Sequence, residues 1–240
     1  MNKTVLMFSG GLDSACAWHI LRKPDCLYCG GPYGPARAAN QGEMQAMDSL
    51  CALDLEFQSH VVGKFFDWTP FIREGHYTLP RENILAIAAW AAGYNTVLYA
   101  WTQNDSKFKE RIDHMKRVTT GAVDMEGFST DFPVWRFYRH ELIERALSMG
   151  AIKEWLHATW SCVAQGELHC GKCVNCCERF LAFRAAGIPE DESSYRTLPQ
   201  NTGTMIDLVK RNFTDDVWLE HAIKAVGEET VLELRNAKRI

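Results

Sequence analysis

The sequence lacks the features expected of membrane, exported and duplex-binding proteins. Its longest apolar run, Ile84 to Ala92, is too short to cross a bilayer, and its first residues show no signal-peptide pattern. No long basic run is present and the formal net charge is −4, so nucleic acid is not the expected partner. We therefore expect a soluble, cytoplasmic protein that does not contact membranes.

Repeats and low-complexity segments are also missing, and 47% of the 240 residues are hydrophobic, which is enough for a buried core. Apolar segments of strand-forming residues alternate with helical patterns, which predicts an α/β fold with a doubly wound parallel sheet. Strands are predicted at 3–8, 25–28, 56–61, 96–101 and 132–135, and helices at 15–21, 43–53, 80–92 and 139–149. The helix at 80–92 is expected to be buried on nearly every face.

A glycine-containing turn joins the first predicted strand to the first predicted helix, through Phe8-Ser9-Gly10-Gly11-Leu12-Asp13-Ser14. Such a turn presents free backbone N–H groups and the positive end of a helix dipole at one point, which suits a phosphate. The Asp13 carboxylate and Ser14 hydroxyl suggest that a metal ion accompanies the phosphate. It is not a Walker loop, because no lysine follows at the required spacing. The alternative is a simple turn in which Asp13 and Ser14 only cap the helix.

A cysteine cluster is the second strong motif. Three cysteines two residues apart, with a fourth eight positions upstream, can converge as four thiolates on one tetrahedral Zn²⁺: Cys162, Cys170, Cys173 and Cys176. An iron–sulfur cluster is the alternative, since four thiolates also suit iron. Cys177 is a spare thiol. Cys26 and Cys29 form another Cys-x-x-Cys, but no further ligands lie at a suitable spacing, so we expect core residues.

Together the two motifs resemble the 7-cyano-7-deazaguanine synthases, which are members of the PP-loop ATPase superfamily. The likeness covers about residues 3–187 and includes Pro80…Asn83, Met149-Gly150 and Arg179 after the cysteines. The resemblance implies an ATP-dependent ligase of queuosine biosynthesis that binds ATP with Mg²⁺ and structural Zn²⁺. Such an enzyme adenylates 7-carboxy-7-deazaguanine, releases AMP and pyrophosphate, and uses ammonia to form the nitrile.

The resemblance also implies site residues and a domain division. Residues 1–150 would be a PP-loop ATP-binding domain, and residues 151–240 a four-cysteine zinc-binding segment with a helical C-terminal extension. ATP would bind to Phe8, Ser9, Gly10, Gly11, Leu12, Asp13 and Ser14, with Asp13 and Ser14 as catalytic residues. The tail at 202–240 lies outside the resemblance and is expected to pack on the core or on a second copy in a homodimer.

Three segments that should contact the second substrate depart from the family pattern. A Gly-Gln-Arg-His-like segment is replaced by 30–40, a Pro-x-Arg-Asn segment carries Glu82 in place of arginine, and a Tyr-Pro-Asp-Cys-Arg-like element is replaced by 105–108. Arginines would hold the substrate carboxylate, an aromatic ring would cover its flat face, and an acid would accept from its amino edge. The candidates are Arg37 and Arg81, Trp101 or Tyr33, and Asp105 or Glu82.

Two other functions remain open. One is a PP-loop enzyme that adenylates a different carbonyl group, in a tRNA base, a sulfur carrier or a protein terminus. The other is an inactive paralogue that binds nucleotide without chemistry. The presence of both Asp13 and Ser14 argues against an inactive protein.

Overall fold

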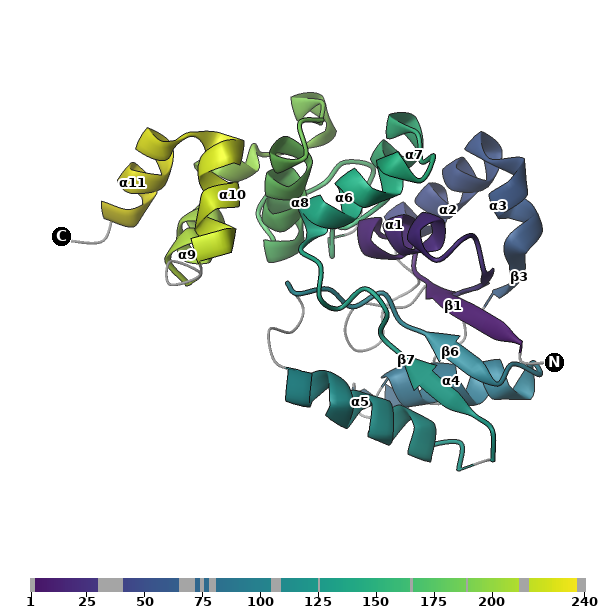
Figure 1. Ribbon diagram of the computed structural model, residues 1–240. Helices are drawn as coiled ribbons and strands as arrows, with labels where there is room; N and C mark the ends of the chain where they lie inside the picture. The colour runs from purple at the N-terminus through teal and green to yellow at the C-terminus, as the bar shows by residue number, and fades with distance from the viewer. Residues whose placement is uncertain are drawn as a thin grey trace.

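A five-stranded parallel sheet lies at the centre of the computed structural model (Figure 1), which describes residues 3–29, 41–64, 72–73, 76–77, 81–104, 109–124, 126–164, 166–188, 190–211 and 216–236. The strand order is β3-β2-β1-β6-β7, and each neighbouring pair is parallel. The strands are β1 (Thr4–Phe8), β2 (Asp25–Tyr28), β3 (Val61–Lys64), β6 (Thr96–Leu98) and β7 (Ser129–Asp131). A separate antiparallel pair is formed by β4 (Ile72–Arg73) and β5 (His76–Tyr77). The predicted α/β class is confirmed.

The central strand β1 is buried on both faces, as a parallel sheet covered by helices requires. Leu6 and Phe8 point into one hydrophobic core, while Val5 and Met7 point into the other. In Figure 1, α1 (Leu12–Ile20), α2 (Gln41–Leu53), α3 (Leu55–His60), α6 (Arg139–Ser148) and α7 (Lys153–His157) cover the first face. The second face is covered by α4 (Arg81–Ala91) and α5 (Lys109–Gly121). Neither these nor the other described helices are long and apolar enough to cross a membrane.

The C-terminal helices form a second layer beside the sheet domain. In Figure 1, α8 (Val174–Ala185) lies next to α6, and α9 (Gly203–Arg211), α10 (Asp216–Val226) and α11 (Glu228–Asn236) lie on its far side. Short 3₁₀ helices at Glu192–Ser194 and Pro199–Asn201 connect α8 to α9. Phe180 and Leu181 of α8 share one buried cluster with Met205, Leu208 and Ala222. The tail therefore packs on α8 of its own chain.

The strand predicted at 56–61 is wrong, because most of it is helix α3. The Asp54 side chain accepts a hydrogen bond from the Phe57 backbone N–H at 3.1 Å, so it caps the start of this helix. Phe57 is fully buried, where it packs on Phe8 and Trp18. A capped helix with one buried aromatic anchor therefore replaces the first five residues of the expected strand, and β3 begins only at Val61.

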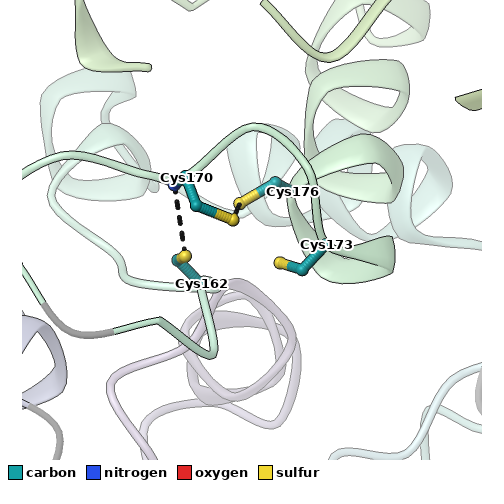
Figure 2. Close-up of side chains that lie close together, drawn as sticks. All are labelled: Cys162, Cys170, Cys173 and Cys176. Carbon is teal, nitrogen blue, oxygen red and sulfur yellow. Dashed lines mark hydrogen bonds between the residues drawn. The ribbon is translucent and has the colours of Figure 1, made fainter. Parts of the chain in front are cut away.

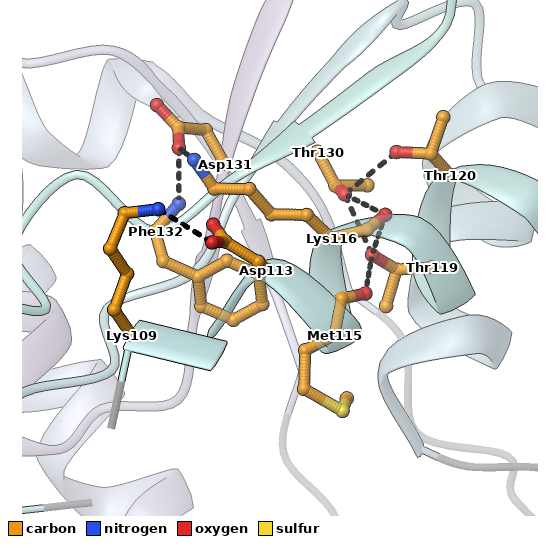
Figure 3. Close-up of polar contacts among 9 residues, drawn as sticks. All are labelled: Lys109, Asp113, Met115, Lys116, Thr119, Thr120, Thr130, Asp131 and Phe132. Atoms are coloured by element: carbon orange, nitrogen blue, oxygen red, sulfur yellow. Dashed lines mark hydrogen bonds and ion pairs between the residues drawn. The ribbon is translucent and has the colours of Figure 1, made fainter. Parts of the chain in front are cut away.

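The strand predicted at 132–135 is also wrong, since β7 lies just before it and consists of polar residues (Figure 3). Its Thr130 hydroxyl makes hydrogen bonds to the Thr119 and Thr120 hydroxyls of α5, at 2.6 and 2.9 Å. Lys116 of α5 forms an ion pair with Asp131 at the end of the strand. This edge strand is held to α5 by polar contacts, so hydrophobic patterning did not reveal it.

Two further expectations need smaller corrections. The strand predicted at 96–101 ends at Leu98, and the next three residues lead into a cavity described below. Helix α4 buries Ile84, Leu85 and Ala89, but its Trp90 side chain is 43% exposed. Its C-terminal end therefore faces solvent, contrary to the expectation of burial on nearly every face.

Candidate functional site

The glycine turn between β1 and α1 has the conformation that the sequence predicted. Gly10 has φ +79°, a left-handed value that favours glycine, and a Cβ there would lie 3.2 Å from the Glu43 carbonyl oxygen. Gly11 is the N-cap of α1. Inside the turn the Ser14 hydroxyl donates to the Gly11 carbonyl at 3.0 Å, and the Gly11 N–H donates to the Ser9 hydroxyl at 3.3 Å. The turn is thus built around glycines and hydroxyls at the N-terminus of a helix.

A cavity of about 310 Å³ opens beside this turn. Its walls come from the turn, the ends of the strands, and the cysteine segment far along the chain. The lining residues are Met7, Ser9, Gly11, Leu12, Asp13, Ser14, Cys29, Glu82, Leu85, Tyr99, Ala100, Trp101, Arg139, Trp160, Ser161 and Asn175. Ligands of parallel α/β sheets bind at this carboxyl edge. The cavity is therefore the best-placed ligand site in the described part of the chain.

Most residues predicted to bind ATP lie at this cavity, but Phe8 does not. Ser9, Gly11, Leu12, Asp13 and Ser14 line it. The Phe8 side chain is fully buried in the opposite direction and packs on aromatic rings of the core. Gly10 contributes its backbone conformation and is not a lining residue.

Asp13 lies in the first turn of α1, and its carboxylate binds a guanidinium. Arg139, the first residue of α6, donates from Nε to both Asp13 carboxylate oxygens at 3.0 Å each, and its Nη2 lies 3.0 Å from Oδ2. Its Nη1 binds Glu178 of α8. Sequence reasoning missed Arg139, because an isolated arginine at a helix start carries no motif.

The residues predicted to contact the second substrate are only partly described. Trp101 lines the cavity, with the Arg111 guanidinium 5.5 Å from its ring centroid, and Glu82 lines the cavity as well. Arg81 is the first residue of α4, but its side chain is not among the described ones. Arg37, Asp105 and Tyr33 lie outside the described residues.

The four predicted cysteines converge in space (Figure 2). Their Sγ atoms all lie within 4.8 Å of one another, and those of Cys170 and Cys176 are 3.9 Å apart. Four sulfurs at about 2.3 Å from a tetrahedral zinc are about 3.8 Å apart, so the cluster needs only a small closing movement to fit the ion. The hydrogen bonds that join these thiols lower the pKa of Cys173 and raise the pKa values of Cys162 and Cys176.

Backbone geometry supports the cluster. Cys162 Sγ accepts N–H bonds from Ala164 and Cys170, both at 3.3 Å. Gly171 has φ +71°, and a Cβ there would lie 1.6 Å from the Thr197 carbonyl oxygen, so the turn between two of the cysteines needs glycine. Cys177 is not part of the cluster. Its Sγ lies near the Thr202 hydroxyl at 3.7 Å, and burial raises its pKa to about 11.

The segment before Cys162 connects this cluster to the glycine turn. The Trp160 N–H donates to the Gly10 carbonyl at 2.9 Å, and the Trp160 indole Nε1–H donates to the Cys162 carbonyl at 2.7 Å. Its ring stacks on His169 with centroids 4.4 Å apart. Ser161 and Asn175, each next to or between cluster cysteines, line the cavity. The cysteine segment therefore forms one wall of the site, which the sequence did not reveal.

The observations define a class of protein: a parallel α/β fold in which a glycine turn at a helix N-terminus and a segment that carries a four-cysteine cluster line one cavity. Residues 82–187 match the family described as "Queuosine biosynthesis protein QueC". Residues 82–187 thus carry a QueC-family domain, and the chain is similar to proteins named 7-cyano-7-deazaguanine synthase, which confirms the predicted resemblance.

Three of these relatives, all named 7-cyano-7-deazaguanine synthase, illustrate the similarity. The Caldicellulosiruptor bescii protein is 23% identical over 78% of this chain and 95% of its own length. The Methanothrix thermoacetophila protein is 26% identical over 79% of this chain and 97% of its own length. The Saccharolobus solfataricus protein is 30% identical over 48% of this chain, but the match spans only 26% of that longer relative. These names are those of enzymes.

Proposed function

We propose that this protein is an ATP-dependent ligase that converts 7-carboxy-7-deazaguanine and ammonia into 7-cyano-7-deazaguanine. One observation supports the proposal above all others: the glycine turn at Ser9–Ser14 and the cysteine segment line the same cavity. The names of the homologues supply the substrate class. The division into a nucleotide-binding domain at 1–150 and a zinc-binding helical segment at 151–240 is part of this proposal.

The chemistry requires activation, because a carboxylate is a poor electrophile. Its oxygen attacks the α-phosphorus of ATP, and pyrophosphate leaves. Ammonia then attacks the acyl carbon of the mixed anhydride and displaces AMP, which gives the amide. A second ATP adenylates the amide oxygen, again with loss of pyrophosphate, and elimination of AMP with two protons leaves the nitrile.

In this reaction the residues of the glycine turn bind the nucleotide. Backbone N–H groups at the start of α1 bind phosphate oxygens, and Asp13 and Ser14 hold Mg²⁺ beside them. The other end of the cavity takes the deazaguanine. Trp101 and Trp160 bring two indoles to a flat ring, and Glu82 accepts hydrogen bonds from a guanine-type edge.

Arg37 and Arg81 remain the proposed partners of the substrate carboxylate, with Asp105 at the amino edge. A charge-assisted, bidentate bond to arginine is stronger than a neutral hydrogen bond. Of Arg37→Ala and Arg81→Ala, we expect at least one to keep normal ATP affinity and to raise the Michaelis constant for 7-carboxy-7-deazaguanine. If both variants use that compound as the wild type does, these assignments are wrong.

Cys162, Cys170, Cys173 and Cys176 would hold one Zn²⁺. Four thiolates leave no open position for water or substrate, so the ion supplies structure and not chemistry. Through the Trp160 bond to Gly10, this closed site helps to hold the glycine turn in place.

The test is incubation with ATP, Mg²⁺, ammonia and 7-carboxy-7-deazaguanine, followed by mass spectrometry for the nitrile and AMP. Asp13→Ala should abolish turnover while the fold is kept, and Asp48→Ala, an exposed change on α2, is the matched control. If AMP is formed but no deazaguanine is converted to a nitrile, the protein is better explained as an enzyme that adenylates another carbonyl group. ADP and orthophosphate as the only nucleotide products would refute the assignment.

A further inference from the structure

Arg139 is the one cationic side chain among the described residues that line the cavity. The other charged lining residues are Asp13 and Glu82, so the described wall carries more negative than positive charge. ATP and pyrophosphate are polyanions, and such a wall repels them unless its charges are rearranged on binding. Among the described residues of the cavity, the Arg139 guanidinium is therefore the side chain best suited to bind a polyanion.

The position of Arg139 is unfavourable for its own helix. A cation in the first turn of a helix opposes the helix dipole. The start of α6 is nevertheless fixed, because the Tyr138 N–H donates to the Glu141 carboxylate at 2.7 Å and the Arg139 N–H donates to Asn104 Oδ1 at 3.2 Å. The helix start is well stabilised without the guanidinium, so the charge placed there needs another explanation.

The guanidinium lies between two carboxylates from different parts of the fold. Asp13 belongs to the glycine turn and Glu178 to the helix that follows the cysteine cluster. The side chains of Arg139 and Glu178 are each 11% exposed, and that of Asp13 is 20% exposed, so solvent screens these pairs only in part. Two of the three nitrogens, Nε and Nη2, are directed at Asp13, the residue proposed to hold Mg²⁺.

We propose that Arg139 binds the phosphate groups of the nucleotide and that its ion pair with Asp13 is the ligand-free form of the site. The inference rests on the proposed function. When Mg²⁺ and nucleotide enter, Asp13 exchanges the guanidinium for the metal ion, and Arg139 exchanges the carboxylate for phosphate oxygens. Glu178 stays bonded to Nη1 and keeps the side chain in place. The forked guanidinium suits phosphate, which it binds in a bidentate manner.

The position of Arg139 favours phosphate as its ligand over the carboxylate of the second substrate. Nε and Nη2 of Arg139 lie 3.0 Å from the carboxylate of the glycine turn, and that turn is the phosphate site in the proposed function. Arg139 is therefore a phosphate-binding residue, and Glu178 is its positioning residue.

The test measures binding and needs no turnover. Isothermal titration calorimetry measures the affinity for α,β-methylene-ATP, which cannot be cleaved between its α and β phosphates. The titration is done once in the presence of Mg²⁺ and once in the presence of EDTA. Arg139→Gln should weaken binding about 10-fold to 100-fold, the range for a lost charge-assisted hydrogen bond. Arg139→Lys should lie in between. Arg145→Gln is the matched control, since Arg145 is exposed on the same helix and does not line the cavity.

A second arm tests the exchange of partners without changing Arg139. Asp13→Asn releases the guanidinium, so in EDTA this variant should bind α,β-methylene-ATP more tightly than the wild type. The gain from Asp13→Asn should be smaller when Arg139 is already replaced by Gln, that is, in the Asp13→Asn, Arg139→Gln double variant compared with Arg139→Gln alone. Removing a negative charge would help an anion in any background, so an equal gain with and without Arg139 would refute the exchange.

The outcomes separate this inference from the proposed function. If the wild type binds no nucleotide, both fail. If it binds nucleotide and Arg139→Gln binds equally well, only the inference fails. If Arg139→Gln leaves nucleotide binding intact and weakens binding of 7-carboxy-7-deazaguanine, Arg139 is a carboxylate ligand and the inference is wrong.

Discussion

A buried ion pair between α8 and the segment that follows it should contribute strongly to the free energy of unfolding. Arg179 of α8 and Glu190 have side chains that are 1% and 3% exposed, and Nη2 lies 2.5 Å from Oε1. The guanidinium also donates to the Thr159 hydroxyl at 2.6 Å and to the His157 carbonyl at 3.2 Å, which ties α8 to the segment before the cluster. We predict that Glu190→Gln destabilises the protein substantially, because it leaves the Arg179 charge buried without its partner.

The size of the effect follows from the carboxyl group itself. Burial alone would raise the pKa of Glu190, but the Arg179 charge and hydrogen bonds from His157, Arg179 and Tyr195 lower it from its usual 4.5 to about 2. That drop corresponds to about 3 kcal/mol of free energy of unfolding at neutral pH. Removal of one partner from a buried pair costs about 3–5 kcal/mol in other proteins, so the two figures agree.

The pH dependence has a definite sign. A carboxyl group with a lowered pKa in the folded state stabilises the protein above its unfolded pKa and loses this contribution as the pH falls through the folded value. The difference in free energy of unfolding between wild type and Glu190→Gln should therefore be constant above about pH 5 and should shrink from about pH 4.5 towards pH 2.

Urea unfolding at several pH values measures this difference. Glu192→Gln is the matched control, because Glu192 forms an ion pair with Arg184 at 3.0 Å but its side chain is 52% exposed. An exposed pair contributes about 0–1 kcal/mol. If the two variants lose the same stability at pH 7, or if the Glu190→Gln deficit is unchanged in acid, the reasoning is refuted.

Three further changes test the cysteine segment. Cys176→Ser should lower the zinc content, measured by mass spectrometry, and should lower the temperature at which the segment unfolds. The reason is that structural zinc contributes about 10–16 kcal/mol of apparent binding energy in small peptides. If the wild type contains iron and absorbs visible light, the assignment of zinc is wrong. Cys177→Ala should keep a full complement of metal, and a loss of metal would place that thiol in the cluster. Gly42→Ala should lower the melting temperature although alanine favours helices by about 1 kcal/mol, because overpacking costs about 1–3 kcal/mol. Its Cβ would lie 2.2 Å from the Trp160 ring, so an unchanged or raised melting temperature would contradict the packing.

The local motifs were predictable because short stretches of chain determine them. A strand, two glycines and a helix start form an anion-binding turn from their own backbone preferences, and φ +79° at Gly10 is the value that glycine tolerates. The four cysteines converge because close spacing and Gly171 bring three of them together, with Cys162 eight residues upstream. Apolar runs likewise predicted the buried central strands β1 and β2.

The tertiary structure decided the rest, because the residues concerned act through distant partners. Asp13 and Arg139 are 126 positions apart, and neither sits in a pattern that names the other. Asn175 and Ser161 line the cavity in a segment that the Trp160 hydrogen bond to Gly10 joins to the glycine turn. The edge strand β7 pairs with β6 and makes side-chain hydrogen bonds to α5, and neither contact is marked by an apolar pattern. Sequence alone thus determined where each motif forms, while packing between distant segments decided which charges and side chains share the cavity.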